Sequence, residues 1–441
     1  MRGRYTPSAA GEEWCERRLL ARIHRYTVKR LRAEIEAVPA REFLRFLCEW
    51  QRVLPEARMQ GSDALAAVLT QLEGFEAPAA AWETEIVPAR IAEYDPAWLD
   101  EHCRAGRFMW TRLAPRAAAR QEEAARGASP VRATPIVLLA RRNAGQWSAL
   151  AAPAEGLRLT SKAQAVLNII RAQGASFFDE IAEHAGMLPA EAEESLAELV
   201  AMGVVNSDSF AGLRVLLMPS GRRGRAAGFN GRHKRRMALF GMADAGRWAL
   251  VRRSKAAKED REAAVEHIVR TLLRRWGVIF WKLLSREAEW LPPWREILMW
   301  CRRLEARGEI RGGRFVAGFS GEQYATPEAV GLLREVRRKA PSHQFVSLSG
   351  ADPLNLLGII TPGARLPSLS GNRLLLRDGL PVAQYSGGAV QFLEKLAPKE
   401  EWEAQTALLR RQAPLAVDLD LEDGEPAALV SAAITPEGIS R

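Results

Sequence analysis

Sets of three helical segments, each followed by a short β segment, recur along this 441-residue chain. After residue 341 the pattern changes to short apolar runs separated by Gly, Pro and Asn. Together the two patterns predict a mainly α fold with some β-structure, in which tandem winged-helix domains are followed by a small β-barrel-like domain. A composition of 47% hydrophobic and 26% charged residues excludes disordered and collagen-like proteins.

The N-terminal part of the chain is predicted to be helical. Apolar residues at three-to-four spacing predict helices up to about Gly74, so residues 1–74 are predicted to form a helical or winged-helix-like unit. Residues 75–155 predict a second winged-helix-like unit, with a linker at 114–132 that has no apolar stripe. Within it, Asp95 precedes Pro96 and predicts a capped helix start.

Residues 156–220 give the clearest winged-helix pattern. A helix, a short helix and a third helix that begins at Pro189 are followed by a predicted hairpin between Val204 and Leu217. In this order the third helix is the one that can enter a DNA major groove.

The same order returns in residues 259–338. Three helices are predicted at 264–276, 278–288 and 293–307, and the wing at 309–318. In the wing, two arginines flank two glycines, a pattern that suits a hairpin tip reaching a phosphate pair or a minor groove; a solvated tip is the alternative.

Short strands are predicted in the small β-barrel of residues 339–398. They are expected at 345–348, 356–360, 374–376 and 381–383. Residues 399–441 predict a C-terminal helix and an acidic tail, because residues 400–441 hold nine acidic and three basic side chains.

The net charge of +10 is concentrated in a basic segment at residues 221–258. This segment contains twelve Lys and Arg residues and a single acid, Asp244. Dense positive charge attracts a polyanion, because each neutralised phosphate releases condensed counterions. The alternative is a solvated loop that keeps the protein soluble. We predict nucleic-acid contacts at these residues and in the wing: Arg222, Arg223, Arg225, Arg232, His233, Lys234, Arg235, Arg236, Arg252, Arg253, Arg311 and Arg314.

Several longer stretches resemble a known family. Phe75–Glu83, Tyr94–Asp100, Pro292–Glu296, Arg303–Phe315 and Ala351–Leu356 look like the C-terminal region of the bacterial large helicase-related (Lhr) proteins. The resemblance runs from about residue 3 to residue 411, and it implies winged helices and a β-barrel that follow a superfamily-2 helicase core and act in DNA repair. It extends to the tandem winged-helix DNA glycosylases and implies an associated uracil-DNA glycosylase activity.

The helicase core itself is missing from the sequence. There is no GxxxxGK[ST] phosphate loop, so we expect no cofactor on this chain, and ATP and Mg only where a separate helicase core supplies their site. Asp100–Cys103 superficially resembles a DExH box, but it has no phosphate loop before it and is interpreted as helix surface. The four cysteines lie far apart without a CxxC pair and the histidines lack metal spacing, so no metal site is predicted and the cysteines are expected to be buried in a reducing compartment.

A catalytic group is harder to find. A glycosylase needs a pocket for a flipped base and a carboxylate near the sugar. The Gln-x-Gln pair of the crosslink glycosylases is absent, and Asp352, in a turn between predicted strands, is the best carboxylate. The alternative for Asp352 is an Asx-turn residue that precedes proline.

Three hypotheses for the function follow. The first is a helicase-associated module that binds single- or double-stranded DNA. The second is a DNA glycosylase whose base pocket lies between winged helices and β-barrel. The third is an oligomerisation platform for helicase cores. We expect a cytoplasmic protein with DNA as its partner, a helicase core and further copies of the chain as alternative partners, and no membrane contact, because the charged N-terminus lacks a secretory signal and no apolar run is long enough to cross a bilayer.

Overall fold

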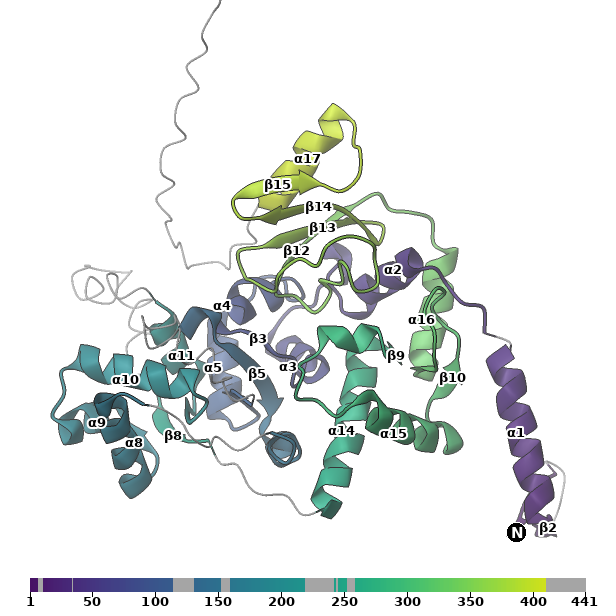
Figure 1. Cartoon of the computed structure of the whole chain (residues 1–441), viewed down its shortest axis with the longest axis horizontal. Helices are drawn as coiled ribbons and strands as arrows, with labels where there is room; N and C mark the ends of the chain where they lie inside the picture. Colours follow the sequence, from purple (N-terminus) through teal and green to yellow (C-terminus); the bar gives the residue numbers. More distant parts are fainter. Residues whose placement is uncertain are drawn as a thin grey trace, which may run out of the picture.

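The fold is described from a computed structural model of the chain (Figure 1). It describes residues 1–6, 11–33, 35–113, 131–151, 159–218, 242, 245–251 and 258–409. Three winged helices follow one another along the chain, and a four-stranded sheet lies beyond the third. In each winged helix the first strand pairs with the last, which gives the sheet orders β3-β5-β4, β6-β8-β7 and β9-β11-β10.

The first winged helix begins after α2 (Ala40–Trp50). Its elements are α3 (Ser62–Gln71), β3 (Ala77–Pro78), α4 (Ala79–Ala81) with a π-helical turn (Trp82–Ile86), α5 (Pro96–Arg104), β4 (Phe108–Thr111) and β5 (Pro135–Ala140). The predicted start of α5 is confirmed, because the Asp95 side chain accepts a hydrogen bond from the backbone N–H of Ala97 and Pro96 occupies the first turn. Since β3 and β5 pair across a sheet that α3 covers, this unit contains residues from both sides of position 74.

The second winged helix contains a long insertion. Its elements are α8 (Ser161–Gln173), β6 (Ser176–Phe177), α9 (Phe178–Ala185), α10 (Pro189–Ala201), β7 (Val205–Ser207), α11 (Phe210–Leu217) and β8 (Arg247–Leu250). The predicted hairpin between Val204 and Leu217 is wrong: its second half is the buried helix α11, and Val205 pairs with Leu250 instead. In chain order, the basic segment therefore begins between α11 and β8.

The third winged helix has a shorter wing. Its elements are α14 (Lys258–Trp276), β9 (Val278–Phe280), a 3-10 turn (Leu283–Arg286), α15 (Trp294–Ala306), β10 (Arg311–Gly313) and β11 (Gln323–Ala325), and α16 (Pro327–Arg338) follows. The predicted helix at 278–288 is wrong, because the buried run Val278–Phe280 pairs with β11 as a strand. β-branched and aromatic residues fit a pleated, buried surface better than a helix.

The C-terminal sheet is an antiparallel meander of β12 (Phe345–Ser349), β13 (Arg373–Arg377), β14 (Leu380–Ser386) and β15 (Ala389–Phe392). The helix α17 (Pro398–Leu409) packs on β12, β13 and β14. Within residues 258–409 no pairing closes β15 onto β12, so the barrel-like shape is not confirmed. The strand predicted at 356–360 is wrong, because this stretch lies in turns of the buried connection between β12 and β13.

Two apolar cores hold these units together. One core is shared by the first and second winged helices, through residues such as Leu99 of α5 and Leu196 of α10. The other joins the third winged helix to α2 and to the C-terminal sheet, through residues such as Phe46 and Leu348. The winged helices and the C-terminal sheet therefore pack against one another through shared apolar cores.

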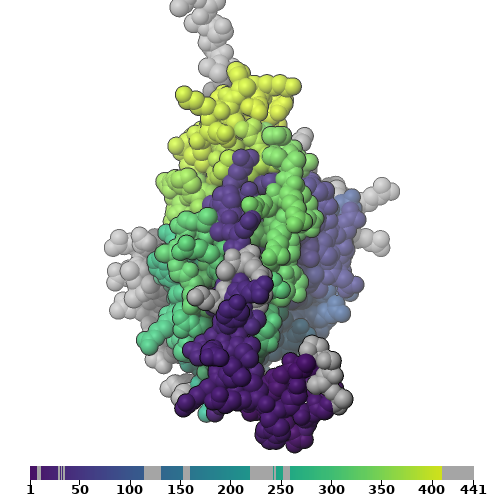
Figure 2. Space-filling view, turned by 90° about the vertical axis from the view of Figure 1, so that its right-hand side faces the viewer, coloured from purple at the N-terminus to yellow at the C-terminus, as the bar shows by residue number. Residues whose placement is uncertain are grey.

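Small elements complete the described chain. They are β1 (Arg2–Gly3), β2 (Glu13–Trp14), α1 (Arg17–Ala33), α7 (Ala144–Ser148) and short 3-10 turns at Pro55–Ala57, Val131–Ala133 and Arg141–Asn143. α1 projects from the body at the end opposite the C-terminal sheet, as the purple segment in Figures 1 and 2 shows. None of the helices within the described ranges has the length and apolarity needed to cross a membrane.

Candidate nucleic-acid interface

The third helix of a winged helix is the element that can reach a groove of DNA, and the third helices of this chain differ in charge. α5 carries one arginine, Arg104, against Asp100 and Glu101. α10 carries four glutamates and no cation: Glu191, Glu193, Glu194 and Glu198. Such a surface repels phosphate. α15 carries three arginines, and each of its two glutamates forms an ion pair with an arginine from another element. We therefore consider α15 the candidate nucleic-acid interface.

The carboxylates of α15 are neutralised by neighbouring elements. Glu296 forms an ion pair of 3.1 Å with Arg261 of α14. Glu305 accepts two hydrogen bonds from Arg32 at the C-terminal end of α1, of 2.9 and 2.5 Å, and a third, 3.0 Å long, from the backbone N–H of Gly312. The hydrogen bond with Glu305 raises the pKa of Arg32. The exposed side of α15 is left with positive charge in excess.

The exposed arginines of α15 lie on one side of the helix. Arg295, Met299, Arg302 and Arg303 are exposed and follow one another at i, i+4 and i+7 or i+8, a spacing that lines one helix face over about 12 Å. Arg303 stacks on the buried Trp300 ring at 4.6 Å, which orients its guanidinium. Arg302 forms an ion pair of 3.2 Å with Glu322 of the wing. We call Arg295, Arg302 and Arg303 the α15 arginine face.

The two wing arginines do not lie at a hairpin tip. Arg311 is the first residue of β10 and pairs with Ala325, so it sits at the base of the hairpin, and the turn of the wing lies at residues 317–318. Arg314 follows the end of β10. Both side chains are exposed. Their predicted position at a tip is wrong, and their contact with nucleic acid stays a prediction.

Most of the predicted basic contacts lie outside the described residues. These are Arg222, Arg223, Arg225, Arg232, His233, Lys234, Arg235, Arg236, Arg252 and Arg253. At the edge of this segment Arg247 is described; it is exposed and pairs with Asp208 at 3.3 Å. The role of the basic segment therefore stays a prediction.

Asp352 is a structural residue. Its carboxylate is 1% exposed and accepts two hydrogen bonds from Arg90, of 2.7 and 3.1 Å, and one of 2.9 Å from the backbone N–H of Leu354. The last bond is the Asx turn that the sequence offered as the alternative. Arg90 is fully buried and also donates to Gln51 at 2.8 Å. Both oxygens are engaged away from solvent, which favours the Asx-turn alternative, and a catalytic role for Asp352 stays a prediction.

The interpretation of Asp100–Cys103 as helix surface is also wrong. Asp100, His102 and Cys103 are buried, although the segment does lie on the helix α5. Asp100 accepts a hydrogen bond of 2.9 Å from Arg214 of α11, whose guanidinium also binds both oxygens of Glu83 at 2.7 Å. This buried cluster ties the second winged helix to the first. Sequence spacing gave no signal for it, because its members are far apart in the chain.

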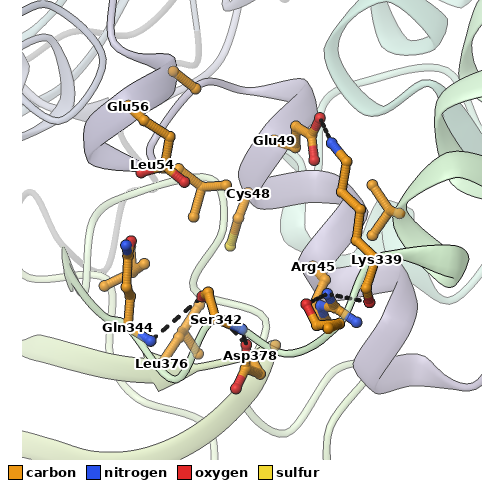
Figure 3. Close-up of a pocket in the computed structure, with 15 residues that line it drawn as sticks. Arg45, Cys48, Glu49, Leu54, Glu56, Lys339, Ser342, Gln344, Leu376 and Asp378 are labelled. Carbon is orange, nitrogen blue, oxygen red and sulfur yellow. Dashed lines mark hydrogen bonds and ion pairs between the residues drawn. The ribbon is translucent and has the colours of Figure 1, made fainter.

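A cavity of about 360 Å³ lies between α2, the end of α16 and the C-terminal sheet (Figure 3). Asp378 accepts hydrogen bonds from the backbone N–H groups of Ser342, at 2.8 Å, and His343, at 3.1 Å, and so shapes the floor. Lys339 pairs with Glu49 at 2.7 Å, and that hydrogen bond raises the lysine pKa. Burial raises the pKa of the Cys48 thiol to about 12, which makes it a poor nucleophile.

No metal centre emerges from the described part of the chain, where no three His, Cys, Asp or Glu side chains gather in a way that could hold an ion. His102 contacts the hydroxyl of Ser62 at 3.2 Å, and His267 lies 3.7 Å from Glu73. Both imidazoles thus have neighbours within the fold. What the described geometry offers is a positively charged surface and a polar cavity.

Comparison with known proteins identifies the winged helices. Residues 38–132 and residues 258–345 each match the family described as large helicase-related protein, winged-helix domain. These ranges contain most of the first winged helix and the whole third winged helix of the structure.

Full-length relatives match most of the chain. A protein of Mycolicibacterium smegmatis named "Lhr helicase/ probable uracil glycosylase" is 28% identical over 422 residues, which cover 90% of this chain and 26% of the relative. A protein of Escherichia coli K12 named "Lhr helicase/uracil glycosylase" is 28% identical over 450 residues, which cover 90% of this chain and 28% of the relative. This chain thus spans about a quarter of the length of these relatives.

Among solved structures, the Streptomyces sahachiroi DNA glycosylase AlkZ aligns with a TM-score of 0.46 and 14% identity, over 84% of this chain and 96% of that one. The sequence matches confirm the resemblance that the motifs indicated, because residues 38–132 and 258–345 match the winged-helix domain of the large helicase-related proteins and both named relatives match over 90% of the chain.

Proposed function

We propose that this chain is a DNA-binding region of an Lhr-type helicase system that acts in DNA repair, and that an ATPase core outside this chain supplies the motor. The observation that carries the proposal is the α15 arginine face, which lies on the third helix of a winged helix. Both glutamates of that helix, Glu296 and Glu305, are already paired with arginines of other elements. Arginines presented in this way release counterions from phosphates and bind single- or double-stranded DNA with little dependence on sequence.

The test is a variant in which Arg295, Arg302 and Arg303 are all replaced by alanine. Three lost phosphate contacts, each worth about 0.9 in the log–log salt slope on duplex DNA, make that slope shallower by about 2.7. Between 50 and 200 mM salt the parent then loses about 40-fold more affinity than the variant. Fluorescence anisotropy with a labelled duplex measures both quantities.

The matched control replaces three exposed arginines that lie on other helices, Arg171 of α8 and Arg334 and Arg338 of α16. It removes the same net charge and is expected to change the slope far less. Equal slopes for the two triple variants would show that only net charge matters and would refute the α15 interface. The basic segment is tested separately, by replacing Arg232, Lys234, Arg235 and Arg236 with alanine, which is expected to weaken binding to all sequences alike.

A second candidate function is the removal of uracil from DNA. The names of the two relatives described above include "probable uracil glycosylase" and "uracil glycosylase". The cavity beside the C-terminal sheet falls within the size range of small-ligand pockets, about 300 to 1,000 Å³. A flipped base needs a pocket that receives it, and this cavity is a candidate for that pocket.

The assay incubates the chain with a uracil-containing oligonucleotide, followed by alkali, with the matched thymine oligonucleotide as control. We expect strand cleavage for uracil alone, and loss of cleavage when Ala57→Phe fills the cavity whose wall it forms. Intact DNA binding without any cleavage would remove this candidate. Cleavage that persists in the cavity variant would move the site elsewhere.

A further inference from the structure

The helix α1 is a dense and exposed source of positive charge outside the winged helices. Its 17 residues include seven Lys and Arg and no Asp or Glu. Arg18, Arg22 and Arg25 follow one another at i, i+4 and i+7, so they form a single stripe on the helix. All three side chains are exposed, and none of them forms an ion pair with a carboxylate of the described chain.

The C-terminal end of α1 is bound to the candidate interface. Arg32 binds Glu305 of α15, and the same carboxylate receives the N–H of Gly312 in β10. This shared anchor places the C-terminal turn of α1 beside α15 and β10, while the rest of the helix extends away from the body (Figures 1 and 2). The nearest arginine of the stripe, Arg25, lies about 10 Å along the helix from the anchored Arg32, and the stripe leads outward from there.

We propose that α1 is an arm that lies along the sugar–phosphate backbone of nucleic acid held at α15. The inference rests on the proposed DNA-binding function and extends its footprint. At 1.5 Å per residue α1 is about 25 Å long, a length that covers about seven base pairs at 3.4 Å each. Along about 10 Å of this length Arg18, Arg22 and Arg25 present guanidiniums, whose charge is complementary to a strand of phosphates.

The apolar side of α1 fits the same partner. Leu19, Ile23 and Tyr26 are 39%, 49% and 67% exposed and form a second stripe beside the arginines. Sugar faces and unpaired bases offer apolar surface next to the phosphates, and an aromatic ring such as that of Tyr26 can stack on a base. An anionic membrane would also attract a basic amphipathic helix, and the experiment separates this outcome from DNA binding.

The experiment compares the parent with an arm variant in which Arg18, Arg22 and Arg25 are replaced by alanine, and measures affinity for duplexes of 10 to 30 base pairs. The parent is expected to reach its full affinity at a length about seven base pairs greater than the variant does. On long duplexes the salt slope of the variant is expected to be shallower by about 2.7. The variant of Arg171, Arg334 and Arg338 again serves as the control of equal charge.

The outcomes separate the arm from the proposed function. An arm variant with the parent's length dependence and salt slope overturns the arm, and the proposed function stands if the α15 variant still loses affinity. A parent that binds no duplex and no single strand overturns both. Arm-dependent binding to vesicles containing phosphatidylserine, together with arm-independent DNA binding, overturns the arm in favour of a membrane surface. Circular dichroism confirms that the variants remain folded.

Discussion

Replacing Asp352 by asparagine tests whether this carboxylate holds the fold together rather than serving catalysis. The substitution keeps the shape of the side chain and removes its charge. Arg90, which is fully buried, then keeps a positive charge with only the Gln51 amide and the Ile86 carbonyl to face it. Because breaking a buried ion pair on one side leaves an uncompensated charge, we expect a loss of about 3 to 5 kcal/mol in the free energy of unfolding.

The structure also predicts which parts of the fold are affected by the loss of unfolding free energy. Arg90 follows the π-helical turn of the first winged helix, Gln51 follows α2, and Asp352 lies in the connection after β12. The pair therefore joins the first winged helix to the C-terminal sheet. Loss of 3 to 5 kcal/mol lowers the ratio of folded to unfolded protein by about two to three and a half powers of ten. Urea unfolding followed by tryptophan fluorescence measures this change.

A double variant provides the control. Arg90→Met with Asp352→Leu removes both charges together, so its loss of unfolding free energy is expected to be well below the sum of the losses of Arg90→Met alone and Asp352→Leu alone. Asp352→Asn with a parental unfolding midpoint, or a double variant whose loss equals that sum, would refute the reasoning. An Asp352→Asn protein that unfolds normally but no longer processes uracil would restore the catalytic interpretation.

Three further predictions concern stability and reactivity. Burial raises the pKa of Glu76, so the folded state binds the proton of this carboxyl group more tightly than the unfolded chain does. Glu76→Gln is therefore expected to increase the free energy of unfolding at neutral pH, and this gain should fade as the pH falls through the raised pKa. Urea unfolding at several pH values measures the effect. Arg214→Met is expected to cost about 3 to 5 kcal/mol because it strands two buried carboxylates, whereas Lys162→Met, which breaks an exposed pair, is expected to leave the midpoint unchanged. Native alkylation at pH 8 is expected to label Cys15 alone, and labelling of all four thiols without denaturant would contradict the burial of the other three, whose pKa values burial raises to about 12: Cys48, Cys103 and Cys301.

The elements that the sequence predicted well are those with local signals. The cap at Asp95 and the proline after it fix the start of α5, and Thr160 caps α8 through the backbone N–H of Ala163. The errors fall on buried apolar runs, where periodicity does not distinguish a strand from a helix. Leu213–Leu217 is a helix and Val278–Phe280 a strand, although both runs are buried and mostly apolar, with Arg214 as the one charged residue.

The candidate site also has features that the sequence predicts and features that it does not. The charge density of the basic segment and the acid-free composition of α1 are visible in the sequence. The availability of a charge is not visible, because it depends on which side chain from a distant element lies beside it. Arg32 binds Glu305, which lies 273 positions later in the chain, and this ion pair neutralises a carboxylate of α15 and leaves the charge of its arginines in excess.

The sequence by itself determined the repeated helical units, several of their caps and the strong bias toward positive charge, since periodicity, capping and composition are local properties of the chain. The tertiary structure alone decided which strand closes each winged helix, which carboxylates are buried with arginine and which arginines remain exposed. Strand pairing and ion pairing are non-local, and the free energy of a charge depends on the solvent and on the partner that the fold provides.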